Sequence, residues 1–270
     1  MPALKLLRMA GHLLVGSVTI LLLFPHLDRH ERGRRVMRWS TRFLKVLGVD
    51  IEVIGRGPSV RAGGALLAAN HVSWLDIHLL HSLLPARFIS KAEVRNWPLF
   101  GFLARASGTV FLVREKKSDA VRVNQIMASH LRDGDCLALF PEGTTSSGRE
   151  LLPFYPSLFQ PAVDAAAQVW PVRIRYLAAD GSSCLDAAYF GDMTLGESVL
   201  KVLRLKGLRA QVTFLPPIPS PGLARRALAQ AAEAAIRASF VAELPADLAR
   251  VSTSPDSAPG STVRLPAGRR

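Results

Sequence analysis

The sequence predicts a mixed α/β fold: a largely buried central sheet flanked by helices on both faces, preceded by an N-terminal two-helix membrane-binding hairpin. From Asp50 onward, short apolar runs without alternation are separated by segments of helical periodicity, which is typical of a sheet covered on both faces. Before Asp50, the chain combines a long uncharged run with a strongly basic segment. A length of 270 residues is sufficient for one large core.

The uncharged run predicts the first helix of the hairpin. Met9 to Leu27 include no Lys, Arg, Asp or Glu, and at about 1.5 Å per residue this helix is about as long as a bilayer core is thick. Whether it spans the membrane or lies in one leaflet stays open. A cleaved signal peptide is a competing interpretation, but no small-x-small cleavage site follows. A buried pair of core helices is the other alternative.

The basic segment predicts the second helix, over residues 28–48. Its mixture of arginines and apolar residues favours a helix in the membrane interface, with Trp39 and Phe43 inserted. Residues 1–49 hold nine Lys or Arg against two acidic residues, so +7 of the net charge of +13 lies in under a fifth of the chain. We expect an anionic membrane surface as partner and no nucleic acid, because aromatic residues are sparse and not interleaved with basic ones.

The domain that follows is predicted to occupy residues 49–244. Its strands are expected at Ile51–Ile54, Ala65–Ala69, Arg87–Ser90, Thr109–Val113, Cys136–Phe140, Trp170–Tyr176 and Gln211–Leu215. Its helices are expected at Trp74–Leu84, Trp97–Ala106, Ser118–Leu131, Ser157–Gln168, Leu195–Leu205 and Leu223–Glu243. Residues 245–270 are rich in Pro, Ser, Ala, Gly and Arg and are predicted to form a disordered tail.

The first chemically informative turn joins the strand at 65–69 to the next helix. Its spacing places His71 on the turn and Asp76 in the first turn of the helix. The carboxylate can then accept the imidazole N–H and leave the other ring nitrogen as a general base. A second interpretation stays open, in which Asp76 only completes a capping box with Ser73 and His71 is an ordinary loop residue.

A second polar turn follows the apolar strand within 137–148. Gly143 and the amides after it can form an anion-binding concavity, with the hydroxyl groups of Thr144 and its neighbours as further donors. Glu142 lies at the end of a buried strand, where an ionised carboxylate needs partners. A nucleotide-binding loop is excluded because Arg149 stands where a P-loop has its lysine.

Basic residues follow two other strands. Arg114 can clamp a phosphate with its planar guanidinium, and Lys91 is a similar candidate. His78 and His81 lie three residues apart without a third ligand, so we predict no metal site. The sequence has no G-x-S-x-G elbow and no serine or cysteine paired with a base. It therefore offers a general base without a protein nucleophile.

Four segments carry a resemblance to a known family. They are Asn70-His71-x-Ser73-Trp74-x-Asp76, Gly108–Arg114, Phe140–Thr144 and Val169–Val172. In this order they resemble the four motif blocks of the glycerolipid acyltransferases, whose typical member is 1-acylglycerol-3-phosphate acyltransferase. The segment Tyr189–Thr194 is similar to some bacterial members, including lyso-ornithine lipid acyltransferases.

The resemblance implies transfer of a fatty acyl group from an acyl thioester to the hydroxyl of a lysolipid at the membrane. It implies His71 and Asp76 as the catalytic pair, and Arg114 with the Glu142-Gly143 block as the binding site for the acceptor phosphate. The expected acceptor is 1-acyl-sn-glycerol 3-phosphate, and lyso-ornithine lipid or another lysophospholipid is the alternative. The donor is acyl-CoA or acyl-carrier protein, and no cofactor is expected.

This chemistry explains the missing nucleophile, because the acceptor hydroxyl takes its place and no acyl-enzyme is needed. Two other classes stay open: a lipid or thioester hydrolase, and a non-catalytic lipid-binding module of the membrane surface. If the first helix spans the bilayer, the arginine-rich segment holds the catalytic domain on the cytoplasmic side of the inner membrane.

Overall fold

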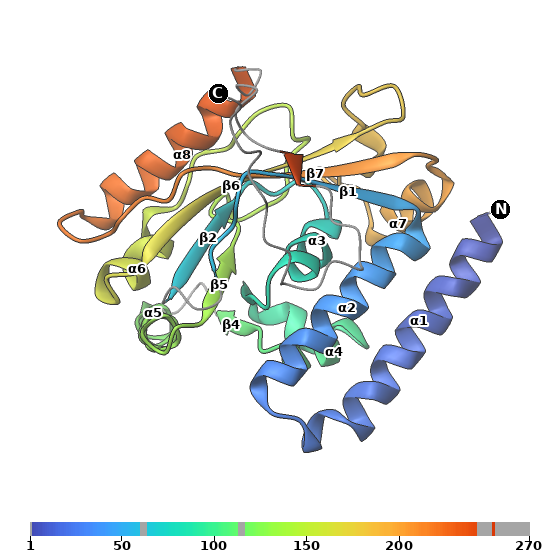
Figure 1. Ribbon diagram of the computed structural model, residues 1–270, viewed down its shortest axis with the longest axis horizontal. Helices are drawn as coiled ribbons and strands as arrows, with labels where there is room; N and C mark the ends of the chain where they lie inside the picture. Colours follow the sequence, from blue (N-terminus) through green and yellow to red (C-terminus); the bar gives the residue numbers. More distant parts are fainter. Residues whose placement is uncertain (1, 60–63, 113–116, 242–249, 252–270) are drawn as a thin grey trace, which may run out of the picture.

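The computed structural model describes residues 2–59, 64–112, 117–241 and 250–251. One mixed sheet runs through it with helices on both faces (Figure 1), which confirms the predicted α/β class. The strands are β1 (Val49–Ile54), β2 (Ala65–Ala69), β3 (Arg87–Lys91), β4 (Val110–Leu112), β5 (Cys136–Leu139), β6 (Gln168–Leu177), β7 (Leu208–Phe214) and β8 (Arg250–Val251). Their order across the sheet is β4-β3-β5-β2-β6-β7-β1-β8.

The helices of the described residues cover this sheet in two layers. The α-helices are α1 (Pro2–Leu22), α2 (Arg29–Leu47), α3 (Leu75–Leu83), α4 (Phe100–Ala106), α5 (Lys117–Arg132), α6 (Gln160–Asp164), α7 (Leu195–Arg204) and α8 (Arg225–Val241). Short 3-10 helices are η1 (Phe24–His26), η2 (Ala92–Asn96), η3 (Pro156–Phe159) and η4 (Leu185–Ala187). Helices α2, α3 and α7 share one core with the sheet, and α5, α6 and α8 share the other.

Strand β2 lies at the centre because all five of its residues are apolar and buried. It pairs in parallel with β5 on one side and β6 on the other. Its side chains alternate between the two cores: Leu67 packs with the α2–α3–α7 layer and Leu66 with the α5–α6–α8 layer. The carboxyl ends of β2 and β5 therefore meet at one edge of the sheet, where both polar turns begin.

The N-terminal hairpin consists of α1 and α2 running side by side in opposite directions (Figure 1). Lys5 Nζ donates to the carbonyls of Leu47 and Leu205, at 2.9 Å each, and so fastens the start of α1 to the ends of α2 and α7. An ammonium group at two helix C-termini is favoured by both helix dipoles. Trp39 Nε1 donates to the carbonyl of His12 at 3.2 Å, which joins the middle of the two helices.

The predicted insertion of Phe43 into a membrane is wrong, and Trp39 is half-buried and stacks with His12 and Phe43. Phe43 is only 2% exposed, and Trp39 stacks on it with ring centroids 5.2 Å apart. The apolar face of α2 packs on α3 and belongs to the core of the domain. The large exposed apolar side chains of the hairpin lie instead on α1 and just after it: Leu4, Leu6, Leu7, Leu14, Val15, Val18, Leu21, Leu22 and Leu23.

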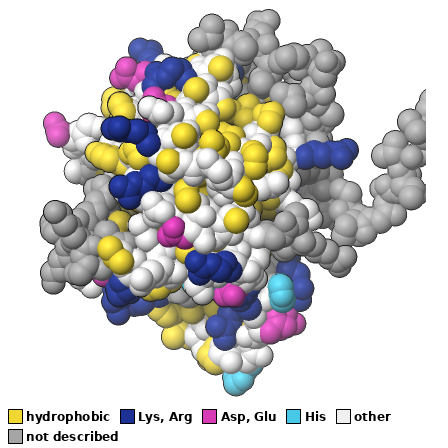
Figure 2. Space-filling view, turned by 90° about the vertical axis from the view of Figure 1, so that its left-hand side faces the viewer, with side chains coloured by type: hydrophobic (Ala, Val, Ile, Leu, Met, Phe, Trp, Pro, Cys, Tyr) yellow, Lys and Arg dark blue, Asp and Glu magenta, His cyan; other side chains and the backbone are white. Residues whose placement is uncertain are grey.

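Helix α1 is long and apolar enough to cross a membrane by length and composition, and only 6% of its most apolar window is buried. A different face of the molecule, the one that carries α5, α6 and α8, has basic side chains that are scattered among apolar and acidic ones rather than gathered in one patch (Figure 2).

Two predicted helices are shorter than expected. The helix predicted from Trp97 begins only at Phe100, because Leu99 adopts a φ of 61° just after Pro98. The helix predicted over 157–168 is divided into η3 and α6, and it ends before Ala166, whose φ is 50°. Of the predicted tail, the structure describes only β8, which pairs with β1 in antiparallel orientation.

Candidate active site

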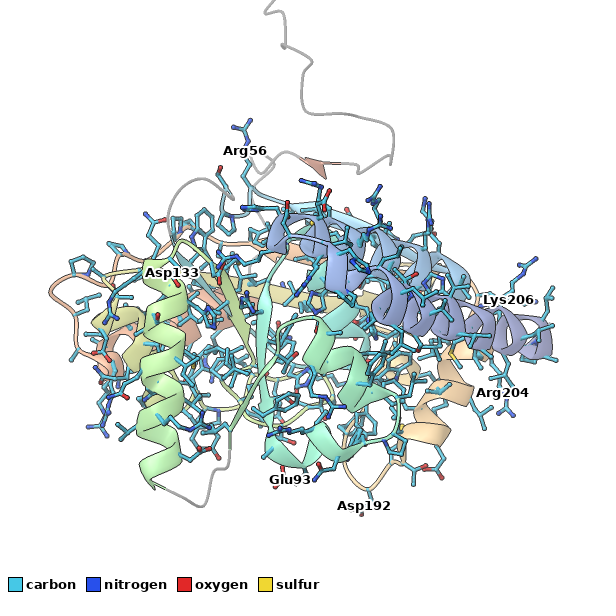
Figure 3. All side chains as sticks on the ribbon, turned by 90° about the horizontal axis from the view of Figure 1, so that it is seen from below. Arg56, Glu93, Asp133, Asp192, Arg204 and Lys206 are labelled. Carbon is cyan, nitrogen blue, oxygen red and sulfur yellow. The ribbon has the colours of Figure 1, made fainter. Side chains whose placement is uncertain are left out.

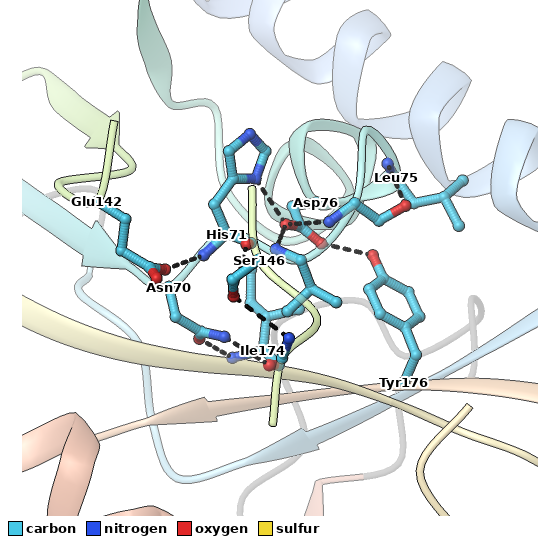
Figure 4. Close-up of polar contacts among 11 residues, drawn as sticks. Asn70, His71, Leu75, Asp76, Glu142, Ser146, Ile174 and Tyr176 are labelled. Carbon is cyan, nitrogen blue, oxygen red and sulfur yellow. Dashed lines mark hydrogen bonds and ion pairs between the residues drawn. The ribbon is translucent and has the colours of Figure 1, made fainter. Parts of the chain in front are cut away.

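The site begins where β2 ends. The Asn70 side chain accepts from Ile174 N at 2.6 Å and donates to Ile174 O at 2.9 Å, so its amide continues the pairing with β6 beyond the last residue of β2. Asn70 is only 1% exposed, and this pairing satisfies the buried amide. The backbone then turns and presents His71 just after the end of β2, where its N–H contacts Glu142 (Figure 4).

His71 and Asp76 are in contact, as the spacing predicts. The Asp76 Oδ2 atom accepts from His71 Nδ1 at 2.8 Å and also from the backbone N–H groups of Val72 and Ser73, at 2.7 and 2.9 Å. The interpretation in which Asp76 only completes a capping box with Ser73 is wrong, because α3 is capped at Trp74 without a side-chain cap hydrogen bond and Asp76 Oδ2 also fixes the imidazole. Because a carboxylate only accepts, Nδ1 is the protonated nitrogen and Nε2 is left as the basic one.

Tyr176 completes the environment of Asp76, and sequence reasoning missed it. Its hydroxyl donates to Asp76 Oδ1 at 2.7 Å from strand β6, 100 residues away (Figure 4). Burial and the Asp76 carboxylate raise the pKa of Tyr176, so the phenol stays a donor. Asp76 is fully buried but accepts four hydrogen bonds, which compensates for the loss of water around its charge.

The imidazole of His71 is held flat against Phe140. The two ring centroids are 3.8 Å apart and the planes differ by 6°. The His71 side chain is 17% exposed and lines a cavity of about 730 Å³. No described residue forms a hydrogen bond with Nε2, so this nitrogen is available to a substrate.

Glu142, which is predicted to bind the acceptor, is not among the residues that line this cavity. Its two carboxylate oxygens accept from the backbone N–H groups of His71, at 2.7 Å, and Leu152, at 2.9 Å. Burial raises the pKa of Glu142 to about 7, opposed by these two hydrogen bonds. Glu142 therefore positions the turn that carries His71, and both of its carboxylate oxygens take part in this positioning.

The residues after Glu142 do reach the cavity. Gly143, Thr144 and Thr145 line it together with His71. Gly143 has a φ of 70° and donates its N–H to Phe140 O at 3.0 Å, which closes a tight turn that favours glycine. Ser146 N donates to His71 O at 2.8 Å, so the two polar turns are joined directly.

Most of the cavity wall is apolar. It extends from His71 to the hairpin, where Ile20, Phe24 and Val36 line it, and to β3 and α4, where Phe88 and Leu103 line it. Such a shape suits a long hydrocarbon chain that ends beside a polar reaction centre. The described part of the chain contains no group of three His, Cys, Asp or Glu side chains that could hold a metal ion.

Two predicted binding residues cannot be placed. Arg114 lies outside the described residues, and Lys91 is the last residue of β3 with a side chain that is not described. His78 and His81 lie on α3, where His81 is buried and His78 is half-buried.

An imidazole oriented by a buried carboxylate, beside an apolar cavity at the edge of an α/β sheet, defines an acyl-transfer type of site. Comparison with known proteins specifies the class. The family model described as Acyltransferase matches residues 50–175. The chain is 40% identical to a lyso-ornithine lipid O-acyltransferase of Pseudomonas aeruginosa over 76% of its length and 78% of the relative.

A 1-acyl-sn-glycerol-3-phosphate acyltransferase of Neisseria meningitidis is 37% identical over 68% of this chain and 72% of that relative. The crystal structure of PlsC, the 1-acyl-sn-glycerophosphate acyltransferase of Thermotoga maritima, has the same fold, with a TM-score of 0.61 at 21% identity over 92% of this chain and 100% of PlsC. The chain belongs to the Acyltransferase family, and it is an enzyme of the lysophospholipid acyltransferase type.

Proposed function

We propose that this chain is a membrane-associated O-acyltransferase that moves a fatty acyl group from an acyl thioester to the free hydroxyl of a lysolipid. The observation that carries the mechanism is the chain of contacts from Tyr176 through Asp76 to His71, which leaves Nε2 free at the cavity. Nε2 removes the proton of the acceptor hydroxyl while its oxygen attacks the thioester carbonyl. The C–S bond then breaks, and the leaving thiolate of coenzyme A or acyl-carrier protein takes the proton from the His71 imidazolium.

The tetrahedral intermediate carries a negative oxygen that needs donors. Thr144 and Thr145 line the cavity beside His71, and their N–H and hydroxyl groups are the donors we assign to this oxygen. Gly143 contributes by its conformation, because the tight turn brings these residues to the cavity.

For the acceptor we propose 1-acyl-sn-glycerol 3-phosphate, which gives phosphatidic acid. Arg114 remains the residue predicted to bind its phosphate, from the sequence alone. Lyso-ornithine lipid is the second candidate, because several relatives that match over about 70–80% of their length carry that name, including those of Pseudomonas aeruginosa and Rhodobacter capsulatus.

We also propose that the hairpin holds the enzyme on the cytoplasmic face of the inner membrane. The exposed leucines of α1 supply a salt-insensitive apolar contact, worth about 1.5–3 kcal/mol for each side chain that becomes fully buried. Exposed Arg204 and Lys206 lie beside the start of α1 (Figure 3) and add cationic groups at that end. Replacing exposed Leu14 and Leu21 by Gln should reduce flotation with anionic vesicles, whereas Tyr155→Gln, which lies outside the hairpin, should not.

The decisive experiment uses the purified full chain, a labelled acyl thioester and a panel of lysolipids, with the product identified by mass. We expect the label in a diacyl lipid, and a loss of about 10²–10⁴-fold in His71→Ala. Release of free fatty acid at the full rate without any acceptor would identify a hydrolase. Unchanged transfer by folded His71→Ala would refute the mechanism, and no turnover of any substrate would favour a non-catalytic lipid-binding module.

A further inference from the structure

A segment outside the four motif blocks lies against the catalytic turn. Tyr189 N donates to Val72 O at 2.8 Å, on the turn that carries the imidazole. The chain before it is tied to β6, where Cys184 N donates to Tyr176 O at 2.9 Å. Val72 and Tyr176 both donate to Asp76, so the backbone of Tyr189 is joined to the array that orients the imidazole.

The other end of this segment is fixed as well. Thr194 forms a capping box with Glu197 at the start of α7. Trp74 Nε1 on the α3 side donates to Ser198 Oγ at 3.1 Å, which joins α7 to the catalytic turn. Between these anchors Gly191 has a φ of 66°, which allows the chain to reverse. The short segment is therefore held in place beside the catalytic turn.

The segment forms part of the rim of the cavity. Tyr189, Phe190 and Gly191 line the same cavity as His71. Phe190 is 38% exposed and Gly191 is exposed, whereas Tyr189 is half-buried. At such a rim the polar head group of a lipid stays in contact with water while its chain lies against the apolar wall.

The hydroxyl of Tyr189 differs from those of the other two tyrosines of the chain. The Tyr176 hydroxyl is buried and donates to Asp76. Tyr155 is 56% exposed and does not line the cavity. The Tyr189 hydroxyl is accessible and forms no hydrogen bond with a described residue. Packing at the rim needs only the aromatic ring, so the hydroxyl adds an uncharged donor beside the reaction centre.

We propose that Tyr189 is a substrate-contacting residue whose hydroxyl donates a hydrogen bond to an oxygen of the acceptor head group, beside the hydroxyl that His71 activates. The inference rests on the proposed lysolipid acyltransferase function and names one determinant of acceptor binding. The oxygen belongs to the phosphate of lysophosphatidic acid or to the carboxylate or amide of a lyso-ornithine lipid. Thr144 and Thr145 keep their assignment to the transition-state oxygen, so Tyr189 acts on acceptor binding.

Tyr189→Phe tests this contact and removes only the hydroxyl, because the bond to Val72 uses the backbone N–H. The acceptor KM, measured with a dispersed short-chain lysolipid, should rise by roughly 2- to 10-fold for a neutral oxygen and by about 10- to 100-fold for an anionic one. The kcat and the KM for the thioester should change by less than about twofold. Tyr155→Phe is the matched control and should leave all three constants unchanged.

The choice of acceptor identifies the oxygen. If the contact is to phosphate, the preference of the wild type for lysophosphatidic acid over 1-acylglycerol should shrink in Tyr189→Phe. If it is to the other head group, the acceptor KM should rise for lyso-ornithine lipid and not for lysophosphatidic acid. An unchanged KM for both lipids, or a fall in kcat of equal size with every acceptor, would overturn the proposal.

Equilibrium binding separates this contact from the proposed function. The same short-chain lysolipids are titrated into His71→Ala and into the double variant His71→Ala/Tyr189→Phe, and the double variant should bind more weakly by the factor seen in KM. If the wild type transfers to no lysolipid while this difference in binding persists, the proposed function fails and the contact stands. Equal binding by the two variants would refute the contact.

Discussion

Replacing Asp76 by Asn tests the contact on which the mechanism depends. The Asp76 carboxylate accepts four hydrogen bonds, three of them at Oδ2. An Asn fits only if its oxygen takes the Oδ2 position and its NH₂ group faces the hydroxyl of Tyr176, which must then accept. The variant should fold at a cost of about 1–3 kcal/mol for the disturbed buried hydrogen bond.

The effect on the rate should be much larger than this cost suggests. When His71 takes the proton of the acceptor, an imidazolium forms beside the carboxylate, with Nδ1 and Oδ2 2.8 Å apart. Two unit charges about 4 Å apart at an effective dielectric constant of about 20 attract by about 4 kcal/mol. Since about 1.4 kcal/mol corresponds to a factor of ten, we expect kcat to fall by about 10³-fold.

The assay measures kcat for acyl transfer together with the thermal unfolding midpoint. Tyr176→Phe is the matched control, because it removes one donor to Asp76 but keeps the charge and the contact with His71. It should lose stability comparable to Asp76→Asn but only a small part of the activity. A folded Asp76→Asn with wild-type turnover, or a Tyr176→Phe with an equal loss of kcat, would refute the reasoning.

Three further predictions follow from the same geometry. Burial raises the folded-state pKa of Glu142 to about 7, so ionisation of this group above its unfolded-state pKa opposes folding. Between pH 5 and pH 8 the unfolding free energy of the wild type, measured in urea, should fall by up to about 3 kcal/mol relative to that of Glu142→Gln. Parallel pH curves of the two proteins would contradict this. Phe43→Ala should lower the unfolding free energy by about 3–5 kcal/mol, because this hairpin residue is core; a loss below about 1 kcal/mol would restore the membrane-inserted interpretation. Arg114→Ala should raise the acceptor KM for lysophosphatidic acid, and Arg114→Lys should restore it only partly; unchanged acceptor kinetics would remove Arg114 from the site.

The revised position of Phe43 also changes how the hairpin can be tested. Deleting residues 1–47 would remove buried Phe43, Leu44 and Leu47 from the core, so loss of activity in that deletion would not report on membrane attachment. Substitutions at exposed positions of α1 are informative because they leave this core intact.

The sequence by itself determined the features that depend on neighbouring residues. Strand β2 has the predicted bounds, because its five apolar residues are flanked by Gly64 and Asn70, which leaves little choice of register. The spacing of His71 and Asp76 sets their contact, because a turn followed by one helical turn has few conformations. The α/β class followed for the same reason, from periodicities that each segment carries internally.

Only the tertiary structure decided which partners complete the site. Tyr176 reaches Asp76 from β6, and Glu142 turns inward to the His71 amide, because the parallel pairing of β2 with β5 and β6 brings distant strand ends together. The apolar face of α2 could equally have faced lipid, since both environments exclude water. The packing of Phe43 against α3 and the sheet settled that question, and no local pattern contains this information.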